Sequence, residues 1–248
     1  MVLSFLLRKE DFMKKILGIL RNTVNKHNLI EEGETIGVGI SGGKDSMTLL
    51  YELKKFQKFS NIKFNLHAIK INIGFEKEED NKIIEEFCNS LGVELTIEYS
   101  DIETVVFDIK KEKSPCALCA NMRRGALASV ANRLGIKKIA LGHHKDDKIE
   151  TFFMNMLYSG RLNTFQISSY LSRTDVTIIR PFYEVDEHLI NTFIKNHDIP
   201  IIKSNCTVDK NTKREEIKEF LKETYPKFKG SKTSIEKALK NKDQFNLF

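Results

Sequence analysis

Two hydrophobic patterns alternate along the chain, and together they predict its fold. Short apolar runs of strand length lie at residues 36–40, 64–71, 93–99, 138–142 and 176–180. Segments with apolar residues three and four positions apart, as in amphipathic helices, lie at residues 5–28, 47–53, 78–91, 102–109, 119–134, 147–158, 186–196 and 213–224. Strands that alternate with helices are typical of a parallel sheet covered by helices on both faces, so the sequence predicts an α/β fold.

The same pattern predicts which side chains are buried and how the chain is divided. In the helix over residues 78–91 we expect Ile83, Ile84, Phe87 and Leu91 to point inward, with Cys88 as a small buried residue. We expect three parts, which are an amphipathic helix within residues 1–30, a catalytic α/β domain over 31–225 and a loosely held, lysine-rich tail with one short helix over 226–248.

Composition narrows the class of protein. The 248 residues are 41% hydrophobic and 30% charged, which is typical of a globular chain. No apolar stretch approaches the roughly 18 residues that span a bilayer, so we expect a cytoplasmic protein without a membrane partner. A net charge of +6 modestly favours a polyanionic partner. Four cysteines are too few for a disulfide framework here, which leaves metal binding, catalysis or burial as their uses.

The segment Ser41-Gly42-Gly43-Lys44-Asp45-Ser46 links the first predicted strand to a helix. A turn of this kind directs backbone N–H groups and the positive end of the helix dipole at one point, which is an anion site. The two glycines allow close approach, the serine hydroxyls add donors and Lys44 adds charge. The segment lacks the Walker spacing, and we expect it to bind the phosphates of a nucleotide.

Three of the cysteines form a candidate metal site. Cys116 and Cys119 have the spacing of paired metal ligands, and Cys206 lies in a loop between two predicted helices, from which it can approach the pair. Three thiolates leave one iron of a 4Fe-4S cluster open to substrate or sulfide. A structural zinc usually needs four ligands, so the alternative is a zinc site completed by His143, His144 or His197.

Charged residues follow two of these segments. Arg123 and Arg124 lie about one helical turn after Cys119, where they can neutralise phosphate or polarise a leaving group. The segment from Gly142 to Asp147 ends a predicted strand and begins a helix, so its two aspartates are available as helix caps, magnesium ligands or substrate contacts.

Taken together, these segments resemble the iron-sulfur tRNA 2-thiocytidine synthetases, within the PP-loop tRNA thiolases. The resemblance spans roughly residues 10–225 and is found at residues 30–33, 41–46, 115–119, 123–127, 141–147, 150–152, 180–181, 206 and 214. It implies the Rossmann-like fold of the PP-loop ATP pyrophosphatases. It also implies ATP, Mg²⁺ and a 4Fe-4S cluster as cofactors, tRNA as substrate, a cysteine desulfurase or inorganic sulfide as sulfur donor, and a homodimer.

The resemblance also implies roles for individual residues. Cys116, Cys119 and Cys206 would hold the cluster. Ser41, Gly42, Gly43, Lys44, Asp45 and Ser46, with Gly142, would bind ATP. Lys44, Asp45, Arg123 and Asp147 would act in catalysis, the last two beside the nucleotide and the target base. The chain departs from the family in lacking a second C-x-x-C around Cys206, and it lacks the zinc-binding arms of thiolases that modify uridine.

The predicted reaction is attack of the C2 oxygen of a tRNA pyrimidine, most plausibly cytidine, on the α-phosphate of ATP, followed by replacement of AMP with sulfur. Three alternatives stay open at this point. They are the same chemistry on a tRNA uridine or a small molecule, a nucleotide-binding or RNA-binding module with a structural cluster, and a zinc-stabilised ATP pyrophosphatase.

Overall fold

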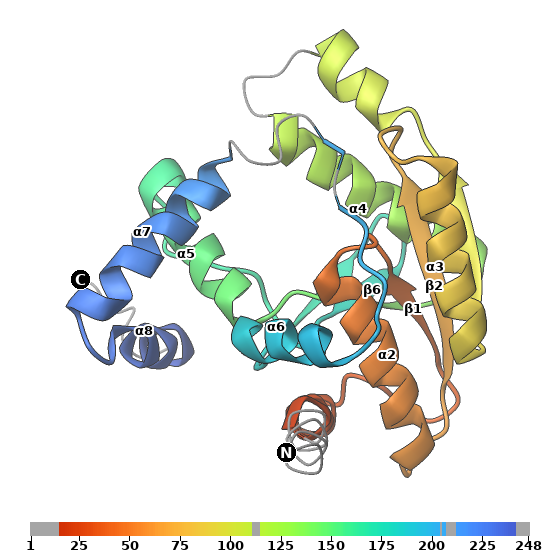
Figure 1. The fold of residues 1–248 in the computed structure, drawn as a ribbon, viewed down its shortest axis with the longest axis horizontal. Coiled ribbons are helices and arrows are strands. Elements are labelled where there is room, and N and C mark those ends of the chain that lie inside the picture. Colours follow the sequence, from red (N-terminus) through yellow and green to blue (C-terminus); the bar gives the residue numbers. More distant parts are fainter. Residues whose placement is uncertain (1–14, 111–114, 204, 207–211, 242–248) are drawn as a thin grey trace. The chain divides into compact units, whose positions relative to one another are not determined.

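The computed structural model describes residues 15–110, 115–203, 205–206 and 212–241 (Figure 1). The strands are β1 (Thr35–Gly39), β2 (Asn65–Asn72), β3 (Glu94–Tyr99), β4 (Lys138–Ala140), β5 (Ser168–Leu171) and β6 (Val176–Ile179). The helices are α2 (Lys44–Phe59), α3 (Glu78–Leu91), η1 (Thr104–Lys110), α4 (Pro115–Arg133), α5 (Lys145–Ser159), α6 (Glu187–Asn196), α7 (Lys213–Lys227) and α8 (Ser231–Lys240), after a leading helix whose described part covers 15–26. None of the described helices is long and apolar enough to cross a membrane.

The strands form one sheet in the order β3-β2-β1-β4-β6-β5, in which every pair is parallel except β5 with β6. The chain builds outward from β1 to β3 and then returns to place β4 on the other side of β1. In open α/β sheets, ligands bind at such a switch point, beyond the carboxyl ends of the strands. The segments that follow β1 and β4 therefore mark the place to look for a site.

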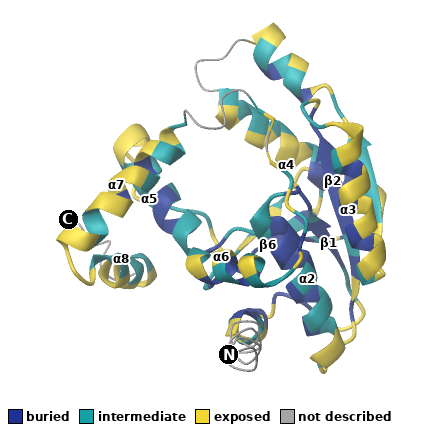
Figure 2. Cartoon of the chain, viewed as in Figure 1, coloured by how far each residue is buried: buried dark blue, intermediate teal, exposed yellow. Residues whose placement is uncertain are grey.

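Each face of the sheet has its own core. The leading helix, α2, α3 and α6 cover one face, where Leu50, Ile84 and Phe193 are buried with Val38 of β1. The helix α4 and the π-helical turn η1 cover the other face, where Val106 is buried against β2 and β4. The strands β1, β2, β4 and β6 are among the most deeply buried parts of the chain (Figure 2). The predicted α/β sheet with helices on both faces is confirmed.

Three details differ from the expectations. The helix α4 begins at Pro115, four positions before the predicted start at residue 119, so Cys116 lies in its first turn and not in the segment before it. The strand β5 was not predicted, because its four residues alternate between exposed and half-buried positions and give no apolar run. Ile83 is 39% exposed, because Ile84, Phe87 and Cys88 form the buried stripe of α3 and Ile83 lies beside that stripe.

The chain divides into two compact units, which we describe separately. Unit 1 comprises Met1–Lys145 and Gln166–Cys206, and it contains the whole sheet. Unit 2 comprises Asp146–Phe165 and Thr207–Phe248, with α7, α8 and nearly all of α5. The core of unit 2 is small, and Ile235 and Leu239 of α8 pack against its buried residues. The short helix expected in the lysine-rich tail is present as α8. The predicted helix over 5–28 lies partly outside the described residues.

Candidate active site

The loop after β1, residues 41–46, is held by its own hydrogen bonds. The backbone N–H of Ser41 donates to Ser46 Oγ (3.1 Å), and the backbone N–H of Gly43 donates to Ser41 Oγ (3.3 Å). Ser46 Oγ donates to the carbonyl of Gly43 (3.0 Å), which leaves Ser41 Oγ as the donor in the 3.1 Å contact between the two hydroxyls. Gly42 has φ +80°, a conformation that favours glycine. The loop is thus closed before any ligand binds, with the first N–H groups of α2 at its centre.

Lys44 lies in this loop between two carboxylates. Its Nζ is 2.8 Å from Asp45 Oδ1 and 2.8 Å from Glu187 Oε1 of α6. Burial lowers the pKa of the Lys44 ammonium, but Asp45 and Glu187 outweigh that effect and raise the pKa above its ordinary value. Lys44 is therefore a permanent cation at neutral pH. Glu187 was not foreseen, because its partner is 143 positions away and only the fold brings the two residues together.

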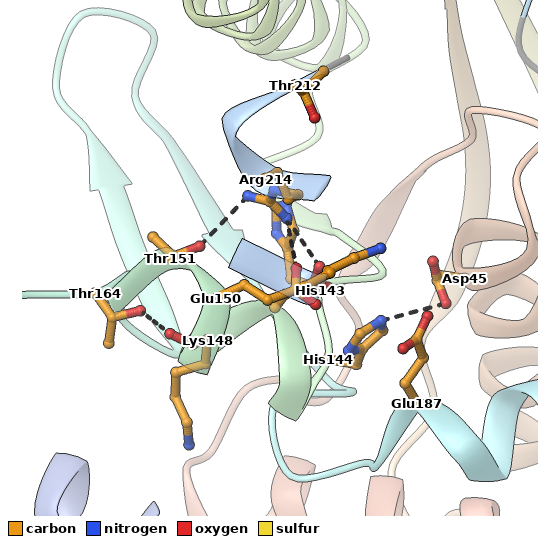
Figure 3. A network of polar contacts seen from close by, with 12 residues as sticks. Asp45, His143, His144, Lys148, Glu150, Thr151, Thr164, Glu187, Thr212 and Arg214 are labelled. Atoms are coloured by element: carbon orange, nitrogen blue, oxygen red, sulfur yellow. Dashed lines mark hydrogen bonds and ion pairs between the residues drawn. The ribbon is translucent and has the colours of Figure 1, made fainter. Parts of the chain in front are cut away.

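The segment after β4 packs directly on this loop. A Cβ on Gly142 would lie 2.9 Å from the backbone carbonyl of Asp45, so only glycine allows this approach. His144 is buried, and its Nε2 is 3.7 Å from Asp45 Oδ1 (Figure 3). The structure therefore gives Gly142 a packing role at the predicted nucleotide site.

The imidazole of His143, next to His144 in the chain, accepts a hydrogen bond from Arg180, the residue that follows β6. The guanidinium of Arg180 is buried, donates from Nε to His143 Nδ1 (3.2 Å) and donates from Nη1 to the carbonyl of Gln166 (2.6 Å). Burial lowers the pKa of Arg180 to about 10, and it remains charged at neutral pH. Because Nδ1 of His143 accepts this bond, the proton of the neutral imidazole lies on Nε2.

The predicted cysteine ligands all belong to unit 1. Cys116 is exposed and Cys119 is half-buried, and the two lie three positions apart on α4, on one side of the helix. Cys206 is half-buried in the segment that follows α6. Cys88 is fully buried in α3, and burial raises the pKa of its thiol to about 12, so it is an inert core residue as predicted.

Two contacts attach the segment before Cys206 to the nucleotide loop and to α3. The backbone N–H of Ile202 donates to the carbonyl of Gly42 (3.0 Å), and the side chain of Ile202 would be 3.1 Å from a Cβ at Gly42. The amide of Asn205 lies 3.4 Å from both the carbonyl of Phe75 and Asp80 Oδ2. The segment that leads to Cys206 therefore contacts the loop of residues 41–46.

The three thiols and Arg123 share one electrostatic environment. Burial raises the pKa of Cys119, Arg123 lowers it, and Cys206 and Cys116 raise it further. Burial lowers the pKa of Lys70, an almost wholly buried lysine on β2 that sequence analysis missed; Glu76 raises this pKa and Arg123 lowers it. Nζ of Lys70 is 3.4 Å from Glu76 Oε1. A lysine within an apolar run is usually interpreted as an edge or surface residue. The sequence therefore gave no signal for the pair of Lys70 and Glu76.

The sequence left two kinds of metal site open for the three cysteines, a 4Fe-4S cluster and a zinc. Thiolates that share one zinc converge to about 4 Å of one another, because each Zn–S bond is about 2.3 Å. Within the described ranges, no three His, Cys, Asp or Glu side chains are grouped as ligands of one ion. The imidazole of His197 also bonds the carbonyl of Phe193 (2.8 Å) and stacks on its ring. A 4Fe-4S cluster at Cys116, Cys119 and Cys206 stays a prediction, and so does a zinc site.

Asp147, the fourth predicted catalytic residue, lies in unit 2. Its carboxylate pairs with Arg214 of α7 (3.0 Å), and Arg214 also reaches Thr151 Oγ1 (3.5 Å) and Glu150 (3.8 Å) (Figure 3). The carboxylate of its neighbour Asp146 pairs with Lys232 of α8. These pairs join the first turn of α5 to α7 and α8 within the unit. The catalytic role of Asp147 stays a prediction.

Comparison with known proteins identifies the family. The model of the PP-loop domain family matches residues 9–224. The chain is 33% identical to a tRNA-cytidine(32) 2-sulfurtransferase of Pelobacter propionicus over 95% of its length and 88% of that protein. It is 35% identical to the tRNA-cytidine(32) 2-sulfurtransferase of Pseudomonas syringae pv. tomato, over 94% of its length and 85% of that protein. The chain belongs to the PP-loop tRNA-cytidine 2-sulfurtransferases.

A solved structure extends the comparison to the fold of the family. The U34-tRNA thiolase NcsA of Methanococcus maripaludis, solved with its [4Fe-4S] cluster, aligns with a TM-score of 0.76 over 93% of this chain and 79% of that one. At 23% identity, this likeness shows a shared fold. The predicted membership in the tRNA 2-thiocytidine synthetase family and the predicted PP-loop fold are both confirmed.

Proposed function

We propose that this chain is an ATP-dependent sulfurtransferase that replaces the C2 oxygen of a cytidine in tRNA with sulfur, in the cytoplasm. The observation that supports this most is the hydrogen bond from Ile202 to Gly42. It joins the loop that suits ATP phosphates to the segment that leads to Cys206, which supports one site of unit 1 for the nucleotide and the cysteines. Family membership supplies tRNA cytidine as the acceptor.

The first step activates the base. The C2 oxygen attacks the α-phosphorus of ATP, the bond to the β-phosphate breaks, and pyrophosphate leaves. The loop of residues 41–46 would hold the pyrophosphate through backbone N–H groups and the hydroxyls of Ser41 and Ser46. Lys44, held as a cation by Asp45 and Glu187, would offset the charge that develops on the phosphates. Asp45 would share a Mg²⁺ with the phosphates.

The second step transfers sulfur. A sulfur nucleophile attacks C2, the bond to the adenylated oxygen breaks, and AMP leaves with its electron pair. Cys116, Cys119 and Cys206 would hold a 4Fe-4S cluster, which would supply the sulfur for this attack. Arg123, which is exposed on α4 one turn after Cys119, would neutralise the phosphate of the leaving AMP. Family membership alone supports two further proposals, which are sulfide or a cysteine desulfurase as donor and a homodimeric enzyme.

The test is an anaerobic reaction of the reconstituted enzyme with ATP, sulfide and an unmodified tRNA transcript that has cytidine at position 32. We expect 2-thiocytidine by mass spectrometry of the nucleosides, with one AMP and one pyrophosphate for each sulfur transferred. A matched transcript with uridine at position 32 should stay unmodified. Release of ADP and phosphate, or thiolation of the uridine transcript alone, would contradict the proposal.

A further inference from the structure

Residues 227–230, the last residue of α7 and the turn that leads to α8, present one aromatic ring between two lysines. Pro226 lies inside the last turn of α7, which ends at Lys227, and Gly230 adopts φ +82° at the start of α8. Between them, the backbone N–H of Phe228 donates to the carbonyl of Thr224 (3.0 Å), and the N–H of Ser231 donates to the carbonyl of Phe228 (3.0 Å). The turn is thus fixed at both ends, and Phe228 remains 66% exposed.

The surroundings of this ring are basic. Residues 225–241 contain five lysines and one acidic residue. Ile235 and Leu239 of α8 face the core of unit 2, which leaves Lys237 exposed. Lys229 makes no ion pair with any described residue. Lys227 lies 4.0 Å from Glu223, a pair in which both side chains are at least 70% exposed and which a phosphate can replace.

Three other aromatic residues that are at least 60% exposed lack these surroundings. Tyr99 donates its hydroxyl to Glu78, and Tyr170 donates to Asp175, so both rings lie beside a carboxylate that would repel a polyanion. Phe59 is 73% exposed at the C-terminal end of α2, with one lysine before it and a serine after it. A single exposed ring is ordinary on protein surfaces. The combination of an open ring, a fixed turn and exposed lysines on both sides is particular to Phe228 among these four.

We propose that residues 227–230 are a contact site for single-stranded RNA, in which Phe228 stacks on an unpaired base and Lys227 and Lys229 bind the flanking phosphates. The proposal rests on the proposed function, since a tRNA sulfurtransferase must bind the loops of a folded RNA. An aromatic ring stacks on any base, and lysines bind phosphates without reading sequence. The site therefore contributes affinity and orientation and does not choose the nucleotide to be modified.

The test measures binding of a fluorescent unmodified tRNA transcript over a series of salt concentrations. Phe228→Ala should weaken binding about 10-fold at every salt concentration, because one base loses its stacking partner. Lys227→Ala/Lys229→Ala should weaken binding most at low salt and should reduce the slope of log K against log salt by roughly 1.5, for two lost phosphate contacts. Phe228→Tyr should restore wild-type affinity.

Phe59→Ala is the matched control, since it removes an equally exposed ring from α2 and should bind tRNA as the wild type does. Equal affinities of the Phe228→Ala and Phe59→Ala variants would overturn the proposal while leaving the sulfurtransferase function intact. A wild-type enzyme that binds no tRNA would contradict the proposed function itself. Binding to anionic lipid vesicles that depends on Phe228, with tRNA affinity unchanged, would assign the turn to a membrane surface and also overturn the proposal.

Discussion

The loop of residues 41–46 and the cysteine site are both needed for the proposed reaction, but they are built in opposite ways. The loop is six consecutive residues whose hydroxyls and N–H groups bond to one another at 3.0–3.3 Å. The cysteines come from two segments almost 90 positions apart, and the pKa of the Cys119 thiol is raised by burial and then by both Cys206 and Cys116. The loop is closed by its own bonds, whereas we expect a bound cluster to fix the geometry of the three thiols.

This difference leads to separable effects of substitution. Changes in the loop should reduce the ATP step and leave iron content intact, while changes at the cysteines should remove iron and leave ATP binding intact. The contact between Gly42 and Ile202 is the exception, because it belongs to both regions. The following experiments test this separation.

The largest effect is expected for Cys206→Ala. Loss of one of three thiolates should release the cluster, so iron falls from about four per chain to near zero and thiolation falls below detection. Equilibrium binding of ATP should stay within about twofold of the wild type, because the loop of residues 41–46 is stabilised by its own hydrogen bonds. Cys88→Ala, which changes the buried cysteine of α3, should keep both iron and activity. Retention of a full cluster in the Cys206→Ala enzyme would remove Cys206 from the ligand set.

The second effect is expected for Lys44→Ala, in the loop. Removal of the cation that faces the phosphates should reduce tRNA-dependent pyrophosphate release by roughly 10²- to 10³-fold, a typical loss for one group that stabilises developing charge. Iron content and the optical spectrum of the cluster should not change. Lys58→Ala, in the last turn of the same helix, should have wild-type kinetics. Loss of iron together with activity in the Lys44→Ala enzyme would show that the two regions are not separable.

The third effect is expected for Gly42→Ala, at the contact that joins the two regions. Alanine would have to adopt φ +80°, and its methyl group would lie 3.1 Å from Cβ of Ile202. The segment leading to Cys206 must therefore shift. We expect a roughly tenfold rise in KM for ATP and partial loss of iron. Gly92→Ala is the control, because Gly92 has φ +61° with open space where a Cβ would lie, and it should lose only about 1 kcal/mol of stability. Partial recovery of iron in Gly42→Ala/Ile202→Gly, which removes both Cβ and Cδ1 of Ile202 from the clash, would confirm the steric cause.

The contrast between the loop and the cysteine site also explains which features the sequence could predict. The loop of residues 41–46 could be predicted, since its chemistry lies in consecutive residues between a clear strand and a clear helix. The pairing of Cys116 with Cys119 was visible for the same reason. The partners of these groups were not visible, because Glu187 reaches Lys44, and Ile202 reaches Gly42, only after the sheet has formed. The strand β5 was missed because it lies at the edge of the sheet, half in solvent, where no apolar run is needed.

The smallest effect is expected at Glu52, a fully buried residue of α2, the helix that begins in the loop. Its two carboxyl oxygens have no hydrogen-bond partner among the described residues, and burial raises its pKa to about 8, although Lys55 lowers it slightly. The folded state therefore holds this proton up to about pH 8, whereas the unfolded chain releases it above about pH 4.5. The contribution of Glu52 to stability is greatest below pH 4.5, falls as the pH rises from 4.5 to 8, and is constant above that.

Glu52→Gln keeps the shape of the protonated side chain and removes the titration. The variant should lie within about 1 kcal/mol of the wild type near pH 5 and gain about 4 kcal/mol at pH 8, seen as a rise in Tm of roughly 10 °C. Glu85→Gln, at an exposed position of α3, should show no such pH dependence. Because the gain lies in the helix and not in the loop or the cysteine segment, iron content and pyrophosphate release should be unchanged. An equal gain in Tm at pH 5 and pH 8 would show that Glu52 is ionised in the folded protein.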